Sequence, residues 1–322
     1  MPDGPDSSLP EGDPPPRRRP LRTIAMLPTL LTLGNLCLGF AALYCCARQL
    51  EELGAGRTAA EVLTRNSERL EAIAPSYLAV GVWALLAAMI CDALDGRVAR
   101  RTGAASTFGV QLDSLADIVS FGVAPAMLMM TMVRREFMQW GGDPLGVHRL
   151  AQATALIALI YVCCAALRLA RFNVEASLEE AAHRGFRGLP SPGAAGAVGS
   201  LVLLHDHLEY LGWMPAANLV TWGLPLLTLG VSLLMVSRVP YPHMVSSFFR
   251  HRPFGHVIGI VLVLPPLLLF PEWVLTLAAW AFVLNGPIRR LARRRAGQTP
   301  QQVAAPGAAV VRDEEVDLRR RA

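Results

Sequence analysis

The sequence predicts an all-α membrane protein, a bundle of about eight transmembrane helices, and three observations carry that prediction. The 322-residue chain is 53% hydrophobic and only 17% charged, whereas soluble domains carry about a quarter charged residues. Its mean hydropathy is +0.38. Several apolar stretches approach or exceed the roughly 17–20 residues that a helix needs to cross a bilayer. A soluble globule, a disulfide scaffold or a wholly disordered chain is therefore excluded.

The candidate spans follow one another from residue 24 to residue 288. They are Ile24–Cys46, Leu78–Leu94, Leu115–Val133, Ala151–Leu169, Gly193–Leu211, Leu219–Val236, Val257–Phe270 and Trp273–Ile288. The fifth is weak because His205, Asp206 and His207 interrupt it, and the last two are short and flanked or divided by prolines. The pattern is thus compatible with six to eight spans.

Polar segments delimit the membrane part of the chain. Residues 1–20 are rich in Pro, Asp and Gly, and residues 297–322 are polar and of low complexity. We expect both to be disordered cytoplasmic tails, because neither can bury enough apolar area to fold. Residues 21–296 would form one membrane-embedded domain with a polar insert at 47–76. The first apolar stretch is longer than the h-region of a signal peptide, which favours a retained span.

Arginine supplies all 30 of the Lys and Arg residues, and the formal net charge is +5. With eight spans and the N-terminus inside, 23 arginines fall on the cytoplasmic side and 7 on the other side. This asymmetry agrees with the positive-inside rule and predicts a multi-pass protein of the inner (cytoplasmic) membrane. The arginines flank apolar segments and form no basic face on a soluble module, so we expect no nucleic-acid partner.

Four aspartates interrupt the apolar pattern. Asp92 and Asp95 end the second span, and Asp113 and Asp117 begin the third, with a loop expected at residues 96–112. On helices, spacings of i,i+3 and i,i+4 put each pair on one face. Four converging carboxylates would repel one another, and hard divalent cations relieve that repulsion because they take oxygen ligands and keep positions open for phosphate oxygens. The site would open to the cytoplasm.

Two other interpretations of the aspartates stay open at this point. Each one alone could be an ordinary interfacial carboxylate paired with Arg97, Arg100 or Arg101. A proton- or cation-coupled transporter also gathers carboxylates in the membrane. Transport sites tend to lie near the bilayer midplane, whereas these aspartates lie at predicted cytoplasmic ends. A transporter or a non-catalytic scaffold is therefore the remote alternative.

The complete string is Asp92-x2-Asp95-Gly96-x2-Ala99-Arg100-x8-Gly109-x3-Asp113-x3-Asp117. It resembles, position for position, the signature of the CDP-alcohol phosphatidyltransferase family. The resemblance implies an integral membrane enzyme, a homodimer like its relatives, that moves a phosphatidyl or similar group from a CDP-linked donor to an alcohol. It also implies that the four aspartates bind two divalent cations, Mg²⁺ or Mn²⁺, and that Asp117 is the general base.

The other positions of this string suit the binding of the donor. Arg100 carries a planar guanidinium that fits phosphate oxygens. Gly96 and Gly109 have no side chains, so the nucleotide could approach the helix backbone closely. Ser106, inside the eight-residue gap, matches a position at which family members contact the CDP-lipid.

Segments outside the signature resemble the serine-specific branch of the family. They are Leu27–Phe40, Arg168–Val174 and Phe186–Pro192. The resemblance implies that CDP-diacylglycerol and L-serine give phosphatidylserine and CMP. Arg168 and Arg171 could bind the serine carboxylate or the donor phosphate, or could serve only as positive-inside anchors. A sister transferase that uses glycerol 3-phosphate or inositol phosphate is the nearer alternative.

The first span carries polar residues whose role the sequence leaves open. By resemblance, Thr29 and Thr32 would border the CDP-lipid, although family members often have Asn at the position of Thr29. Polar residues within spans also commonly form hydrogen bonds between helices. Thr29, Thr32 and Asn35 are compatible with either role.

Overall fold

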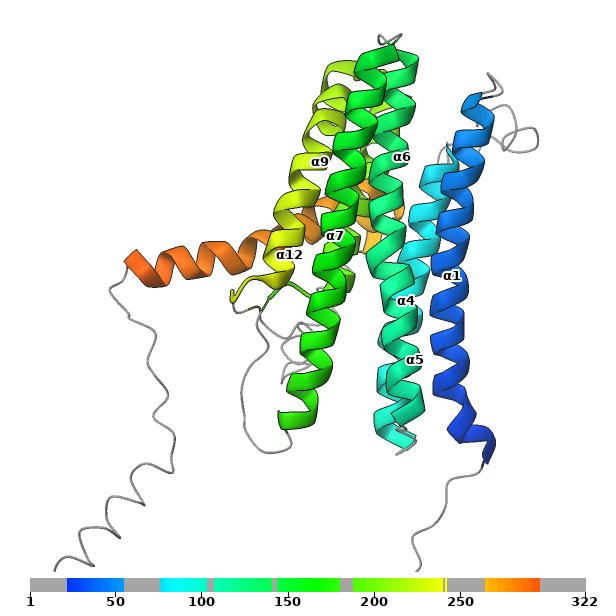
Figure 1. Cartoon of the computed structure of the whole chain (residues 1–322), viewed down its shortest axis with the longest axis vertical. Coiled ribbons are helices and arrows are strands. Elements are labelled where there is room, and N and C mark those ends of the chain that lie inside the picture. Colours follow the sequence, from blue (N-terminus) through cyan, green and yellow to red (C-terminus); the bar gives the residue numbers. More distant parts are fainter. Residues whose placement is uncertain are drawn as a thin grey trace, which may run out of the picture. The chain divides into compact units, whose positions relative to one another are not determined.

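The computed structural model describes residues 22–54, 76–102, 107–140, 144–179, 188–239, 241 and 264–295. Every regular element within these ranges is helical, so the all-α class is confirmed (Figure 1). Five helical stretches in this part of the chain are long and apolar enough to cross a membrane. They are Met26–Gly54, Tyr77–Ala99, Phe108–Gln139, His148–Val174 and Met214–Val236. These stretches mark a multi-pass membrane protein.

The chain divides into two compact units, Met1–Ala158 and Leu159–Ala322, and the boundary falls inside helix α7 (Pro144–Glu179). The described part of the first unit also holds α1 (Arg22–Gly54), α4 (Tyr77–Thr102), α5 (Thr107–Asp117), η1 (Ile118–Val123) and α6 (Ala124–Gln139). The described part of the second unit also holds α8 (Ser191–Tyr210), α9 (Met214–Val236) and α12 (Pro271–Arg295).

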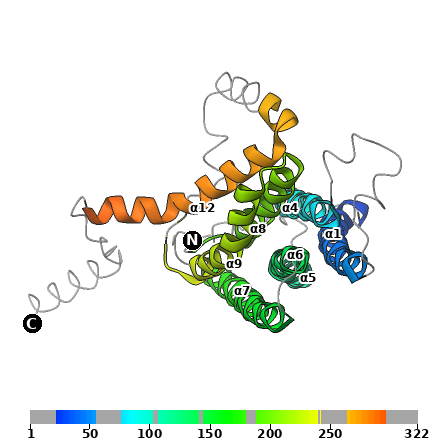
Figure 2. The ribbon, with the colours of Figure 1, turned by 90° about the horizontal axis from the view of Figure 1, so that it is seen from above.

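Helices α1 and α4 lie antiparallel along most of their length in the first unit. The guanidinium of Arg48, late in α1, lies 5.8 Å from the ring centroid of Tyr77 at the start of α4. Thr32, early in α1, bonds to Asp95, late in α4. Helices α5, η1 and α6 form one continuous rod that packs against α1. This rod, α1 and α4 run side by side in both views (Figure 1, Figure 2).

Both helices extend beyond the apolar stretches that predicted them. Helix α1 continues to Gly54, into the predicted polar insert, because Arg48 pairs with Glu51 at 2.6 Å and with Glu52 at 3.0 Å one turn further on. Helix α4 continues to Thr102 and α5 begins at Thr107. The predicted loop at 96–112 is therefore wrong for most of its length, because hydropathy reports where apolar residues stop and not where the helix stops.

A π-helical turn, η1, joins α5 to α6 directly after Asp117. The backbone N–H of Ala124 donates to the carbonyl of Val119, five residues earlier. The next residue, Pro125, has no N–H and so interrupts the α-helical ladder at this point. Turns of this kind are frequent at functional sites, and this one follows the last of the four predicted site aspartates.

In the second unit, α8 packs against both α9 and α12. The turn before α8 is tied to the end of α9, since Gly188 N–H donates to the Val239 carbonyl at 2.9 Å and Leu189 N–H to the Leu234 carbonyl at 3.2 Å. Helix α12 runs crosswise to α9 in both views (Figure 1, Figure 2).

Tyr241 repairs a break in the hydrogen bonding of α12. Pro287 lies inside this helix and has no N–H for the carbonyl of Val283, four residues earlier. The Tyr241 hydroxyl donates to that carbonyl at 3.0 Å. Burial raises the pKa of Tyr241 to about 12. Gly286 makes the approach possible, because a Cβ there would lie 2.5 Å from the tyrosine ring.

The described residues hold five candidate spans, against the six to eight predicted for the whole chain. Helices α8 and α12 form where the fifth and eighth spans were predicted, but neither is among the five apolar stretches. In α8 the interruption at residues 205–207 lowers the hydropathy, and in α12 Glu272 and Asn285 do so. Residues 257–263 of the predicted seventh span, both predicted tails and most of the insert lie outside the described residues.

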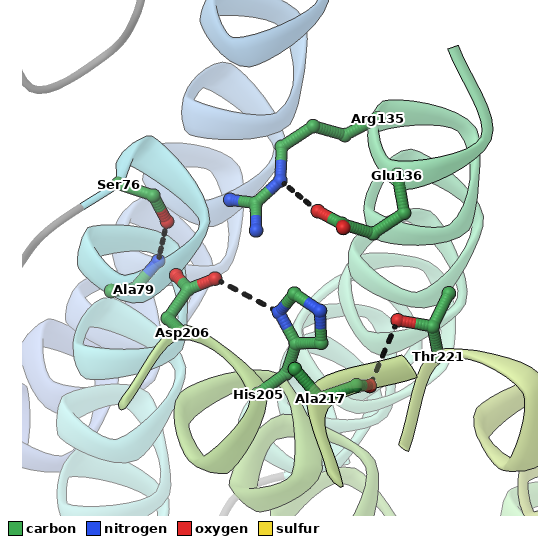
Figure 3. A network of polar contacts seen from close by, with 8 residues as sticks. All are labelled: Ser76, Ala79, Arg135, Glu136, His205, Asp206, Ala217 and Thr221. Atoms are coloured by element: carbon green, nitrogen blue, oxygen red, sulfur yellow. Dashed lines mark hydrogen bonds and ion pairs between the residues drawn. The ribbon is translucent and has the colours of Figure 1, made fainter. Parts of the chain in front are cut away.

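Buried polar groups in each unit find partners close by in the chain (Figure 3). Ser76 caps α4 by accepting the N–H of Ala79 at 3.0 Å. On α6, Arg135 Nε donates to Glu136 Oε1 at 2.8 Å, and both residues are buried. In the second unit, Thr221 Oγ1 donates to the carbonyl of Ala217 at 3.2 Å. Such pairings offset the free-energy cost of placing polar groups away from water.

Candidate active site

The four predicted aspartates come together from two neighbouring helices. Asp92 and Asp95 lie on α4, and Asp113 and Asp117 lie on α5. One carboxylate oxygen from each of Asp92, Asp95 and Asp113 lies within 4.8 Å of the others. The Asp117 carboxylate is close enough to interact electrostatically with all three. Helix geometry therefore places each pair on one face, as the spacings predict.

Helix α1 contributes two direct hydrogen bonds to this cluster. Thr32 Oγ1 lies 3.0 Å from Asp95 Oδ2, and Asn35 Nδ2 donates to Asp117 Oδ1 at 3.2 Å. All four side chains are buried. Since Thr32 and Asn35 are three residues apart on one helix, they share a face, and that face points to the carboxylates.

A close contact between α1 and the π-helical turn lies beside Asn35. Ser120 Oγ donates to the backbone carbonyl of Asn35 at 3.0 Å. A Cβ added to Gly39 would lie 2.8 Å from the Cα of Ser120 and clash with the Ser120 hydroxyl. Only glycine permits this approach, and Ser120 lies three residues after Asp117. The backbone contact therefore fixes α1 next to the segment that carries the last aspartate.

The chemistry of the cluster fits a divalent cation. Asp113 Oδ1 is buried and has no hydrogen-bond partner within the described ranges. A buried carboxylate oxygen in that condition is costly unless a proton donor or a cation meets it. Three carboxylates with oxygens this close form the hard oxygen set that Mg²⁺ and Mn²⁺ prefer. The residues present therefore fit the cations that the resemblance implies.

The structure describes some of the remaining predicted donor-binding residues and leaves others outside the described part of the chain. Gly96 follows Asp95 on α4, and its backbone N–H bonds to that carboxylate. Gly109 is half-buried in the first turn of α5, and Thr29 is half-buried on α1. Arg100 belongs to α4 but its side chain is not described, and Ser106 lies outside the described residues.

In the second unit, two of the segments that resemble the serine-specific branch meet each other. Arg168 Nη1 on α7 donates to Ser191 Oγ, the first residue of α8, at 2.6 Å. Ser191 is fully buried and Arg168 is half-buried. Arg171, one turn further along α7, is half-buried as well. The contact holds the guanidinium of Arg168, on α7, next to the first residue of α8.

A model of the CDP-alcohol phosphatidyltransferase family matches residues 25–229, well over half of the chain. The chain belongs to the CDP-alcohol phosphatidyltransferase family. The matched region includes the four aspartates, the α1 residues that contact them and the Arg168–Ser191 pair. The family resemblance expected from the aspartate string is thus confirmed.

Several curated proteins are similar to this family member. A CDP-diacylglycerol–serine O-phosphatidyltransferase of Mycobacterium leprae is 35% identical over 207 residues, which cover 60% of either chain. A protein of the same name from Helicobacter pylori is 32% identical over 219 residues, 68% of this chain and 83% of the relative. An archaetidylserine synthase of Methanothermobacter thermautotrophicus is 34% identical over 160 residues, 49% of this chain and 56% of the relative.

Sequence reasoning missed the supporting residues around the aspartates. The sequence is compatible with lipid contact or with helix pairing for Asn35, and the structure shows its side chain bonded to Asp117. Ser120 carried no signal at all, since a serine in an apolar run is common. The i,i+3 spacing of Thr32 and Asn35 in an otherwise apolar helix was the one available hint of a shared partner.

Proposed function

We propose that this CDP-alcohol phosphatidyltransferase transfers the phosphatidyl group of CDP-diacylglycerol to the hydroxyl of L-serine, giving phosphatidylserine and CMP. The cluster of Asp92, Asp95 and Asp113, with oxygens within 4.8 Å and Asp117 beside them, is the observation that carries the transfer chemistry. Serine as the acceptor is supported by similarity to the Mycobacterium and Helicobacter proteins named for that reaction.

The residues that would hold two divalent cations are Asp92, Asp95, Asp113 and Asp117. When bound, such cations would supply positive charge at the diphosphate oxygens of the donor and so ease the departure of CMP. Gly96, Gly109, Arg100, Ser106, Thr29 and Thr32 would border the donor, as the resemblance implies.

Asp117 is the residue to which we assign the proton transfer. Its Oδ1 already accepts the hydrogen bond of Asn35, so Oδ2 is the atom to accept the proton of the serine hydroxyl. The serine oxygen then forms a bond to the phosphorus that carries diacylglycerol. The bond from this phosphorus to the bridging oxygen breaks, and CMP leaves with that electron pair. Because Asp117 is only 8% exposed, bulk water has little access to compete with serine.

Arg168 and Arg171 are the cations we assign to the serine carboxylate. An arginine already held in place loses less side-chain entropy when it binds a carboxylate. Arg168 meets that condition through its bond to Ser191.

An acceptor assay tests this function directly. Membranes containing the protein would receive CDP-diacylglycerol with labelled serine, glycerol 3-phosphate or inositol phosphate in parallel. We expect lipid-soluble label from serine alone, with one CMP released per lipid formed. Label from a phosphorylated acceptor without label from serine would instead identify a sister transferase. If no alcohol leads to CMP release and the protein tolerates Asp92→Ala, the result would indicate a transporter or a scaffold.

The base assignment has its own test. Asp117→Asn should abolish turnover, while metal-dependent binding of the donor partly survives. Undiminished activity in that variant would remove Asp117 from this role. We further propose a homodimer in the inner membrane with its site open to the cytoplasm, which light scattering in detergent and protease protection in oriented vesicles would test.

A further inference from the structure

We propose that helix α1 positions two of the four carboxylates of the site through hydrogen bonds from its side chains. In this role Thr32 orients Asp95 and thereby sets the affinity for divalent cations, and Asn35 orients Asp117 and thereby sets the rate of transfer. The inference about Asn35 rests on the proposed function, and the inference about Thr32 rests on the cation site alone. Neither residue is assigned contact with the reacting atoms, so both are positioning residues.

Thr32 holds one oxygen of Asp95 from a buried position. Its Oγ1 lies 3.0 Å from Asp95 Oδ2 and also 3.0 Å from the carbonyl of Pro28 in its own helix. One hydroxyl proton serves mainly one acceptor, and an ionised carboxylate is the stronger acceptor. Thr32 and Asp95 are 4% and 5% exposed, so water does not replace this bond. The bond therefore restricts rotation of the Asp95 carboxylate.

Asn35 holds Asp117 in the same way from the next turn of α1. The amide is fully buried, and its Nδ2 donates to Asp117 Oδ1 at 3.2 Å. An ionised carboxylate can only accept hydrogen bonds, so the NH₂ group and not the carbonyl of the amide must face it. This contact leaves one defined oxygen of Asp117 for chemistry.

The backbone contact between α1 and η1 keeps Thr32 and Asn35 within hydrogen-bonding distance of their carboxylates. Ser120 Oγ donates to the Asn35 carbonyl at 3.0 Å, and the absence of a side chain at Gly39 lets the two backbones approach. The two side-chain bonds run to different helices, α4 and α5. Helix α1 therefore bridges both carboxylate-bearing helices, a role that no pattern around the aspartates themselves reveals.

Partners of this kind typically change metal affinity or activity by about 10–100-fold when they are removed. The reason is that a cation requires its ligands in one geometry, and a carboxylate that can rotate pays an entropic cost on binding. The two α1 bonds therefore predict separable effects on metal affinity and on turnover.

The test compares valine substitutions at two buried threonines in the full-length protein in nanodiscs. Thr32→Val removes the hydroxyl that faces Asp95. Thr228→Val is the matched control, because Thr228 on α9 is fully buried and its hydroxyl donates to the Leu224 carbonyl of its own helix at 2.8 Å. Binding of Mn²⁺ alone, without donor or acceptor, would be followed by electron paramagnetic resonance of the free ion.

We expect Thr32→Val to weaken Mn²⁺ binding roughly tenfold or more, Thr32→Ser to restore it, and Thr228→Val to match wild type. Equal Mn²⁺ affinity in Thr32→Val and wild type would overturn the role of Thr32. If the valine variant does not fold, Thr32→Ala removes the same hydroxyl and replaces it. A wild-type protein that binds no Mn²⁺ would overturn the cation site and this inference with it.

For Asn35, we expect Asn35→Leu to lower kcat by about 10–100-fold with little change in KM for CDP-diacylglycerol. Turnover would be measured with whichever alcohol supports CMP release in wild type, so an error about serine does not affect the comparison. A wild-type kcat in Asn35→Leu, or a loss confined to KM, would overturn the role of Asn35.

Discussion

Replacing Gly39 by alanine should slow the enzyme while leaving it folded. A Cβ at this position would lie 2.8 Å from the Cα of Ser120 and 2.9 Å from its Cβ. Carbon atoms in contact rest about 3.5–4.0 Å apart, so α1 and η1 would have to separate by about 0.7 Å or more. Overpacking of this kind costs about 1–3 kcal/mol, and the better helix propensity of alanine offsets up to about 1 kcal/mol of that.

The separation would act on the site through Asn35, which lies one turn before Gly39 on α1. The distance from Asn35 Nδ2 to Asp117 Oδ1 is 3.2 Å, already at the long end of the N–H···O range. A further shift of about 0.7 Å takes it well past the ~3.2 Å limit of that bond. We therefore expect a fall in kcat of about 10–100-fold, similar to direct loss of the Asn35 amide.

The assay is CMP release from CDP-diacylglycerol in nanodiscs, together with a thermal melt of the same sample. Gly230→Ala is the matched control, since Gly230 lies in α9 and a Cβ there would meet nothing within 4 Å. That variant should keep its turnover and melt at the wild-type temperature or slightly above. A Gly39→Ala protein with wild-type kcat and wild-type Tm would refute the argument from the α1–η1 contact.

Three further predictions concern the cation site, the acceptor and α12. Asp113→Asn should raise Tm in EDTA, because it relieves repulsion among carboxylates within 4.8 Å, and should abolish the rise in Tm that Mn²⁺ gives wild type; an unchanged response to Mn²⁺ would contradict this. Arg168→Ala should raise KM for serine more than it lowers kcat, and Ser191→Ala, which removes the partner at 2.6 Å, should have a smaller effect in the same direction; a loss confined to kcat would count against the carboxylate assignment. Tyr241→Phe should lower the free energy of unfolding by about 1–3 kcal/mol, because the Val283 carbonyl loses its donor, and chemical denaturation with an unshifted midpoint would disprove it.

The part of the candidate site that depends on residues close together in the chain was predictable. A carboxylate in an apolar stretch is costly and therefore conspicuous, and helical spacing determines which side chains share a face. Asp92 and Asp95, and likewise Asp113 and Asp117, are each separated by a single turn. Their grouping follows from the chain itself, and the family match at residues 25–229 agrees with it.

The supporting contacts were not predictable because they join residues far apart in the chain. Thr32 reaches Asp95 across 63 positions and Asn35 reaches Asp117 across 82 positions. Hydropathy also misplaced the ends of α1, α4 and α5, since it reports where the apolar residues stop and not where the helix stops. Helix α12 had the length of a span but lies crosswise to α9.

The sequence by itself determined that this is an all-α, multi-pass membrane protein of the CDP-alcohol phosphatidyltransferase family, and it predicted which four carboxylates come together. Composition and one-turn spacings are properties of the chain before it folds. Only the tertiary structure decided that α1 holds two of those carboxylates, because that depends on how closely two helices approach. The approach is set at Gly39, where the missing side chain admits Ser120 and brings Asn35 to Asp117.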